Sequence, residues 1–257
     1  MSPLFLRSAL ALFLLAMAAA PAAAITISAD AAASPKTLWK AVMTEAYGPY
    51  DSGRKCWIGK SDGNEYCMRP HKLDAVDDGA RLFMAVASAQ GSADSCHGCG
   101  GYLGLLVFDR QADGSYVLAA RNSLFDGAGS WGEVPAEEAF RLTRIGEQAF
   151  AWVVEFGFTA QGHTGISQII YAPVGSEVVD LGFIPTHHDD CGANEVCGSY
   201  TYGLRFEPGT GKEYFDAIAE LAAGSDVPKI ERRYVIPFDA ATRKYVAPEA
   251  YTSVMAM

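Results

Sequence analysis

Short apolar segments with alternating polarity, each ended by a polar turn, recur along most of this chain and constrain its fold more than any other feature. Alternation with a period of two is typical of a strand that buries one face. Residues 102–109 and 116–121, for example, flank a turn that contains Asp113 and Gly114, a pair that favours a tight hairpin. Further strands are expected on the same plan at 81–89, 140–145, 149–158, 166–171, 178–184, 200–206, 233–238 and 244–246.

This succession predicts an all-β fold of mostly antiparallel hairpins arranged as a meander. A sandwich, an irregular barrel and a propeller-like arrangement fit the pattern equally well, because no repeat of fixed length is found. No sharp change in composition divides the chain. Residues 35–257 are therefore expected to form a single β-rich domain, stabilised by disulfides.

Two segments depart from the strand pattern. Ser34 and Pro35 suit the N-cap and the first position of a helix, and Gly48-Pro49 would end it, so a short N-terminal helix is predicted between them. Residues 213–223 carry apolar side chains at helical spacing and are rich in Ala, which favours a second helix there. The alternative for that segment is the return strand of a hairpin that begins at Tyr200.

The N-terminus has the three-part plan of a Sec-type secretory signal peptide. Arg7 supplies the positive charge, an apolar run follows from Ala9 to Ala20, and small residues at 22–24 precede the predicted cleavage site after Ala24. The run is short for a membrane anchor, which needs about 20 apolar residues. We therefore expect a cleaved signal over 1–24, no membrane span in the mature chain, and a flexible leader over 25–34.

Six cysteines form three close pairs along the chain. In an exported protein such pairs are typically disulfides, which predicts a periplasmic or secreted location and the bridges Cys56–Cys67, Cys96–Cys99 and Cys191–Cys197. For the first bridge, a turn over 60–63 that pairs Lys60 with Gly63 would place Cys56 directly opposite Cys67.

The Cys96-x-x-Cys99 spacing also occurs in redox-active dithiols, in which a helix follows the motif and stabilises a thiolate. Here a glycine-rich, strand-like segment follows instead. A structural bridge is favoured for this pair. A zinc site that combines the Cys96–Cys99 and Cys191–Cys197 pairs would require reduced thiols, which an oxidising compartment opposes.

Histidines and acids gather at a second candidate site. His187, His188 and Asp189 are consecutive, and His97 and His163 lie beside other predicted turns. Imidazole and carboxylate groups are ligands for divalent metals such as zinc, copper or manganese. Pro185 and Gly192 predict a loop around 187–189 that would allow the side chains to converge. Solvated polar loops without a metal are the ordinary alternative.

Other signals are weaker. Trp131 lies among glycines on a predicted loop and is a candidate for stacking on a ligand, although such a residue more often closes the end of a β core. No nucleophile motif and no phosphate-binding glycine loop is found, so no catalytic residue is predicted.

Charge narrows the choice of partner. The chain carries 20 basic and 30 acidic residues. Such a surface disfavours nucleic acid. We expect an exported, non-catalytic binding or envelope-accessory protein without a cofactor, whose partner is a protein or a cell-envelope ligand. The alternative is a metal-binding protein or metal-dependent enzyme that uses the histidine cluster.

Overall fold

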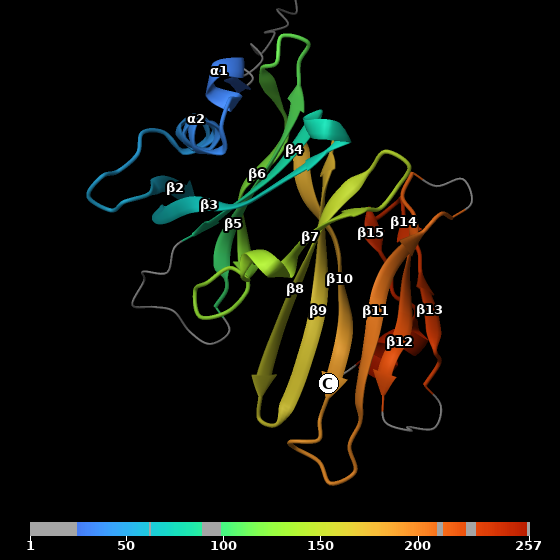
Figure 1. Cartoon of the computed structure of the whole chain (residues 1–257). Coiled ribbons are helices and arrows are strands. Elements are labelled where there is room, and N and C mark those ends of the chain that lie inside the picture. Colours follow the sequence, from blue (N-terminus) through green and yellow to red (C-terminus); the bar gives the residue numbers. More distant parts are fainter. Residues whose placement is uncertain (1–24, 62, 89–98, 210–212, 225–229, 256–257) are drawn as a thin grey trace, which may run out of the picture.

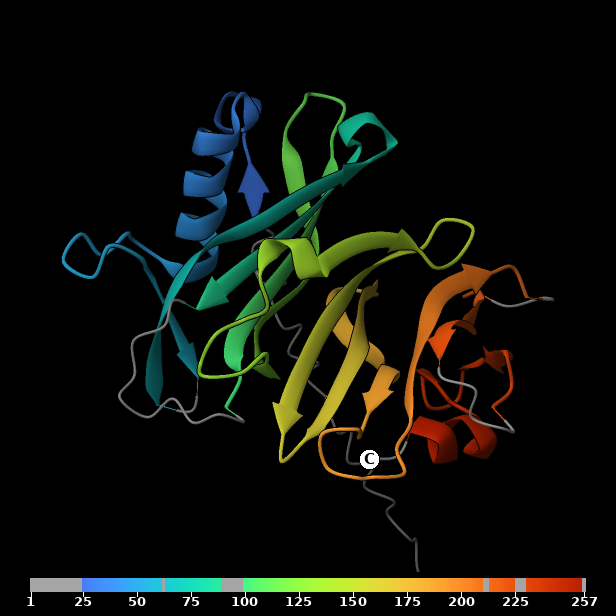
Figure 2. The ribbon, with the colours of Figure 1, turned by 60° about the horizontal axis from the view of Figure 1, so that its bottom comes forward.

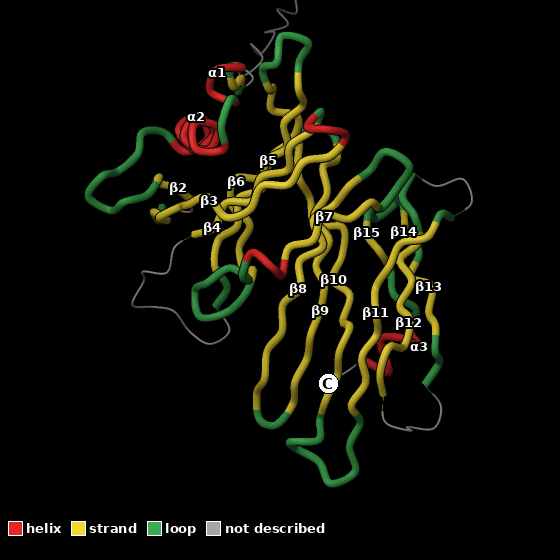
Figure 3. The backbone as a smooth tube through the Cα atoms, viewed as in Figure 1, coloured by secondary structure: helices red, strands yellow, loops and turns green. Residues whose placement is uncertain are grey.

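Strands dominate the computed structural model of the chain (Figures 1 and 3). The structure describes residues 25–257 except 62, 89–98, 210–212, 225–229 and 256–257. The predicted signal peptide and the residues Cys96 and His97 therefore lie outside the described part. Within that part, no helix has the length and the apolar character that crossing a membrane requires.

The N-terminal half combines two helices with a five-stranded meander. Its elements are β1 (Thr26–Ile27), α1 (Ala29–Ala32), α2 (Pro35–Tyr47), β2 (Trp57–Ser61), β3 (Asn64–Val76), the 3-10 turn η1 (Asp77–Gly79), β4 (Arg81–Ser88), β5 (Gly101–Arg110) and β6 (Tyr116–Ala128).

The C-terminal half continues the meander and ends in a short helix. Its elements are η2 (Glu137–Ala139), β7 (Phe140–Arg144), β8 (Phe150–Ala160), β9 (His163–Val174), β10 (Glu177–Asp189), β11 (Ser199–Glu207), β12 (Asp216–Gly224), β13 (Arg233–Ile236), β14 (Phe238–Asp239), β15 (Lys244–Tyr245) and α3 (Glu249–Met255).

Nearly all neighbouring strands pair antiparallel, which confirms the predicted fold class. The two halves meet where the start of β10 lies parallel to β6, with Glu177 opposite Arg121. From there β10 pairs with β9 on one side and, at its far end, with β11 on the other. The strand β10 therefore links every part of the C-terminal half, and its far end carries the predicted histidine site.

Three apolar clusters hold the layers together. The first lies between α2 and one face of β3–β6, and includes Val42, Met84 and Phe108. The second lies between the other face of β4–β6 and β7–β9, around Phe83 and Trp152. The third fills the space between β8–β10 and the curled end of the chain, where β11–β13 and α3 supply buried tyrosines. Figure 2 shows α2 and α3 on opposite sides of the molecule.

The predicted N-terminal helix is confirmed as α2, which has Ser34 as its N-cap and Pro35 in its first turn. The expectation of a flexible leader over 25–34 needs correction. Residues 26–27 pair with β6, Ala29–Ala32 form a helical turn capped by Ser28, and the side chain of Ile27 is buried in the first cluster. The reason is apolar burial, which outweighs the small, polar character of the segment.

The favoured helix over 213–223 is wrong, and the alternative strand is observed. β12 pairs with β11 along its whole length and with β13 over Ala217–Glu220. Ala217 and Ala219 are buried in the third cluster, while Glu220 forms an ion pair with Arg205 on β11. Pairing on both edges overrides the helical preference of Ala and Glu, because tertiary contacts outweigh local propensity.

The Cys56–Cys67 bridge is confirmed, but the predicted register around it is wrong. The strands pair Ser61 with Asn64 and Ile58 with Cys67, leaving a two-residue turn. Cys56 lies just before β2, and the bridge runs obliquely across the hairpin with the two Cα atoms 5.4 Å apart. The turn has the expected length but lies one residue further along the chain, which displaces the register by two residues. Gly63 takes a positive φ of 79° inside the turn rather than pairing with Lys60.

Candidate functional site

His187, His188 and Asp189 are the last three residues of β10, not parts of a loop. They pair with β9 on one side and with β11 on the other. A β-bulge between Pro185 and His187 accommodates the proline, so the strand continues past it. The loop that the sequence predicted begins only at Asp190.

The two adjacent imidazoles do not converge. The Nδ1 atom of His187 lies 2.8 Å from the hydroxyl of Thr201, whereas the ring of His188 stacks on Tyr200 with centroids 5.0 Å apart. Thr201 and Tyr200 are themselves adjacent residues of β11, and neighbouring strand residues point to opposite faces. A metal site that uses both rings from this strand is therefore not formed.

His163 does come close to this end of β10. It is the first residue of β9, after a two-residue turn in which Gln161 and Gly162 both have positive φ, as a type I′ hairpin requires. That turn packs on the loop after β10 so tightly that a Cβ on Gly162 would lie 2.4 Å from the carbonyl carbon of Gly192. The glycine contact joins the β8–β9 hairpin to the loop, and His163 lies half-buried beside it.

Asp190 organises the loop that follows. Its carboxylate accepts hydrogen bonds from the backbone N–H of Gly198 (2.6 Å) and from the side-chain amide of Asn194 (2.9 Å). These two bonds, the Gly198 bond first, lower the pKa of Asp190, and the nearby imidazoles of His188 and His163 act in the same direction. The Nδ1 atoms of both imidazoles are buried and accept or donate no hydrogen bond within the described residues.

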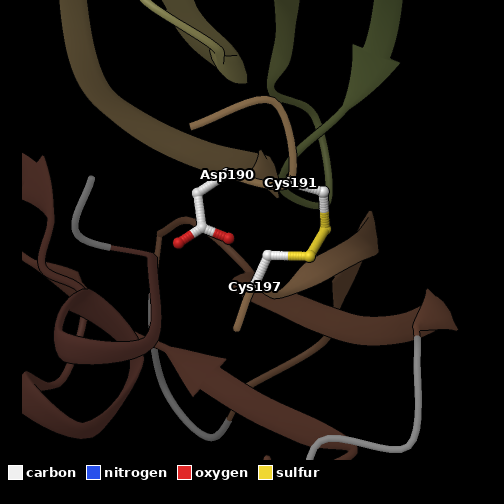
Figure 4. Close-up of side chains that lie close together, drawn as sticks. All are labelled: Asp190, Cys191 and Cys197. Atoms are coloured by element: carbon white, nitrogen blue, oxygen red, sulfur yellow. A yellow bond between two sulfur atoms is a disulfide. The ribbon is translucent and has the colours of Figure 1, made fainter. Parts of the chain in front are cut away.

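The loop is closed by the predicted Cys191–Cys197 disulfide, whose Cα atoms lie 4.8 Å apart. The carboxylate of Asp189 accepts a further hydrogen bond from the backbone N–H of Cys191, at 2.9 Å. Figure 4 shows the carboxylate of Asp190 beside the disulfide. In contrast to these anchored residues, Val196 is 95% exposed at the tip of the loop. We call residues 190–198 the stapled loop.

One group of potential metal ligands is found among the described residues. It consists of Asp190, Cys191 and Cys197, whose ligand atoms lie within 4.8 Å of one another. The two sulfurs are bonded to each other, so neither offers a thiolate in this state. His97 and Cys96 lie outside the described residues, and the Cys96–Cys99 bridge stays a prediction, although no described cysteine is free.

Trp131 lies on the loop between β6 and β7, as expected. Its side chain is half exposed and its backbone has a positive φ of 57°. The loop is closed by a bridge between Ser130 and Glu133 and is tied to the start of β5 through Gly101. This arrangement leaves about half of the Trp131 side chain exposed to solvent on a loop that is tied to the sheet.

Three surface hollows lined by described residues contain none of the predicted site residues. One of about 510 Å³ is lined in part by Arg81, Asp109 and Arg144. Arg81 and Asp109 satisfy each other through two hydrogen bonds of 2.6 and 3.1 Å, and Arg144 donates to the backbone carbonyl groups of Gly146 and Glu147. Both arginine side chains therefore already have hydrogen-bond partners within the protein.

Sequence reasoning identified the histidines, Asp189 and the disulfide, but it missed the packing partners that define the site. Tyr200, which stacks on His188, lies in a predicted strand that gave no sign of this contact. The contact between Gly162 and Gly192 had a weak signal, because glycines bracket His163 in the sequence.

Comparison of the chain with protein-family models gives no match, and comparisons with curated proteins and with solved structures give no significant match.

Proposed function

We propose that this chain is an exported, non-catalytic binding protein that engages a protein partner through the stapled loop. The observation that carries the proposal is the contrast within that loop. Val196 is 95% exposed, yet the loop around it is held by a disulfide and by two hydrogen bonds in which backbone N–H groups donate to carboxylates. A single exposed valine is common, but one presented on a clamped loop is suited to recognition.

Pre-organisation supports this role. A flexible loop loses conformational entropy when it binds a partner. This loss reduces the affinity that the contacts of the loop provide. Here the disulfide closes a separation of six residues, and the Gly162–Gly192 contact fixes the loop against the β8–β9 hairpin. Little ordering remains to be done when a partner binds, so the free energy of contact is retained as affinity.

Charge supports a cationic partner. Asp189, Asp190 and Glu195 gather at this end of the molecule, and positions 186–204 contain no lysine or arginine. Asp189 and Asp190 are also held ionised, because the N–H groups that they bind lower their pKa. An apolar tip in an acidic rim fits a basic surface with an apolar recess, and association should weaken as salt screens the charges.

Two disulfides in the described residues support an oxidising compartment, as the predicted export signal requires. Ile25 packs against the first cluster. Cleavage after Ala24 would therefore leave every described helix and strand in place.

Site-specific photo-crosslinking tests the proposal. A photo-reactive amino acid at position 196 should give a discrete adduct with one partner in the envelope or medium of the producing organism. Excess unlabelled wild-type protein should compete with this adduct, while the Val196→Asp variant should not, because a buried carboxylate in an apolar recess is costly.

The matched control places the same probe at Val235, an exposed valine (45%) on the edge strand β13. Equal adducts from both positions, or an adduct from position 196 that Val196→Asp displaces as well as wild type does, would contradict a specific role of the loop tip.

A further inference from the structure

We propose that reduction of the Cys191–Cys197 disulfide converts the base of the stapled loop into a zinc site, with both thiolates, Asp190 and His188 as ligands. This inference does not rest on the proposed partner, because it concerns the ligand chemistry of the loop itself. It also differs from the site expected from sequence, since it uses neither His187 nor Asp189.

The donor atoms already lie close together. One oxygen of Asp190 and the two sulfurs are within 4.8 Å of one another, and Figure 4 shows this carboxylate beside the disulfide. Nε2 of His188 lies 4.0 Å from Oδ1 of Asp190. Tetrahedral zinc has bonds of about 2.3 Å to sulfur and about 2.0–2.2 Å to nitrogen or oxygen, so its ligand atoms are separated by roughly 3.3–3.8 Å. Once the sulfurs part, the two thiolates and Asp190 supply three donors for one centre. His188, whose Nε2 lies beside Asp190, is the candidate for the fourth position.

The loop keeps supports that do not depend on the disulfide. The N–H groups of Cys191 and Gly198 remain bound to the carboxylates of Asp189 and Asp190. The N–H of Asp190 is bound to the carbonyl of Gly198, at 3.2 Å. Reduction therefore leaves the two thiols near each other. Each carboxylate oxygen has a second lone pair, so Asp190 can bind a metal while it accepts these hydrogen bonds.

His188 suits the fourth position. Its side chain is 9% exposed, and stacking on Tyr200 fixes the plane of the ring. A neutral imidazole with its proton on Nδ1 directs the lone pair of Nε2 to a metal, and Nε2 is the atom that lies near Asp190. The donor set of two thiolates, one imidazole and one carboxylate is typical of zinc and unlike the all-oxygen sites of calcium or magnesium.

The change of state balances as a two-electron reduction followed by proton release. A dithiol reductant transfers two electrons and two protons to the Cys191–Cys197 bond, giving two thiols and the oxidised, cyclic form of the reductant. Zinc then displaces one proton from each thiol. In the reverse direction a disulfide oxidant accepts two electrons from the two thiolates and takes up two protons to become a dithiol. The Cys191–Cys197 bond reforms and the metal is released, so occupancy of the site follows the redox state of the loop.

Cobalt and zinc titrations of the mature chain test this site. The other cysteines are first replaced by serine (Cys56, Cys67, Cys96 and Cys99), and a phosphine keeps the remaining pair reduced. Co²⁺ should then bind at one equivalent, with the visible absorption of tetrahedral cobalt and a thiolate charge-transfer band, and Zn²⁺ should displace it. The oxidised protein should bind neither ion.

Variants separate the ligands from their neighbours. Cys191→Ser or Cys197→Ser should abolish the charge-transfer signal of the two-thiolate site. His188→Gln should weaken zinc affinity by at least about ten-fold, whereas His187→Gln, whose ring contacts Thr201 on the other face, should leave it unchanged.

The proposal fails if the reduced protein binds less than one equivalent, or if His187→Gln and His188→Gln have equal effects. If the four-serine protein does not fold, elemental analysis of the reduced wild type against a Cys191→Ser/Cys197→Ser double variant decides the question. A difference of one zinc per chain supports the site, and no difference overturns it.

Discussion

Single residues decide the geometry at the lower end of the molecule in Figure 1. Asp190 connects the stapled loop to β11 through Gly198, and its charge lies near two imidazoles. Gly162 and Gly192 allow two backbones to touch where any side chain would intervene. None of these three residues has a large side chain, yet together they determine where His163 and the loop lie.

Replacing Gly162 tests that contact. Gly162→Ala should destabilise the protein for two reasons, a strained positive φ of 84° and a Cβ placed 2.4 Å from the backbone of Gly192. Gly63→Ala is the matched control, because Gly63 also has a positive φ, of 79°, but has open space around it. We expect about 1 kcal/mol for the control and about 1–3 kcal/mol more for Gly162, measured by urea unfolding. Equal losses would show that the two backbones do not touch.

At the scale of elements, burial decides between structures that local propensity leaves open. The segment that forms β12 has helical spacing and helix-forming residues, but two neighbouring strands pair with it. Residues 26–27 have no strong propensity and form β1, because Ile27 enters the cluster beneath α2. Both segments depend on partners that lie far away in the sequence.

Ile27→Ala measures how firmly the N-terminal segment is held. Removal of a fully buried isoleucine side chain should lower the free energy of unfolding by about 2–5 kcal/mol, since a cavity remains. Val196→Ala, at a position that is 95% exposed, should change it by less than about 0.5 kcal/mol. If both variants unfolded at the same urea concentration, residues 25–34 would behave as the flexible leader expected from sequence.

At the scale of the whole molecule, the stability of the folded state should depend on pH in the alkaline range, because several tyrosine side chains are buried. Burial raises the pKa of Tyr171, and the nearby charge of Asp180 adds to the effect. Burial also raises the pKa of Tyr47, Tyr202, Tyr245 and Tyr251. A raised pKa means that the folded state favours the neutral phenol. Its stabilising contribution is complete below the unfolded pKa of about 10 and is lost as pH rises above it.

Unfolding midpoints measured from about pH 8 to about pH 11 should therefore fall steeply above about pH 10. Tyr171→Phe should reduce the slope there by up to about 1.4 kcal/mol per pH unit, the value for one proton. Tyr50→Phe, at a half-exposed position, is the control and should leave the slope unchanged. A Tyr171→Phe slope equal to that of wild type would mean that this phenol ionises without unfolding.

Local patterns were enough to predict much of the architecture. Alternating polarity located most strands, Ser34 and Pro35 located the start of α2, and close spacing identified the two described disulfides. The site was harder to predict. His187 and His188 were expected to converge in a loop, but they occupy a strand that crosses Pro185 by means of a bulge. A bulge depends on the neighbouring strand, so one strand read alone does not reveal it.

The sequence by itself determined the class of fold and the chemistry available at the end of β10, because periodicity, caps, turns and cysteine spacing are local properties. Only the tertiary structure decided which of those groups meet. It turned His187 away from His188, paired His188 with Tyr200, and brought His163 to Asp190 through a contact between two glycines. The physical reason is that strand register and backbone approach are set by burial between distant segments, which no single stretch of sequence contains.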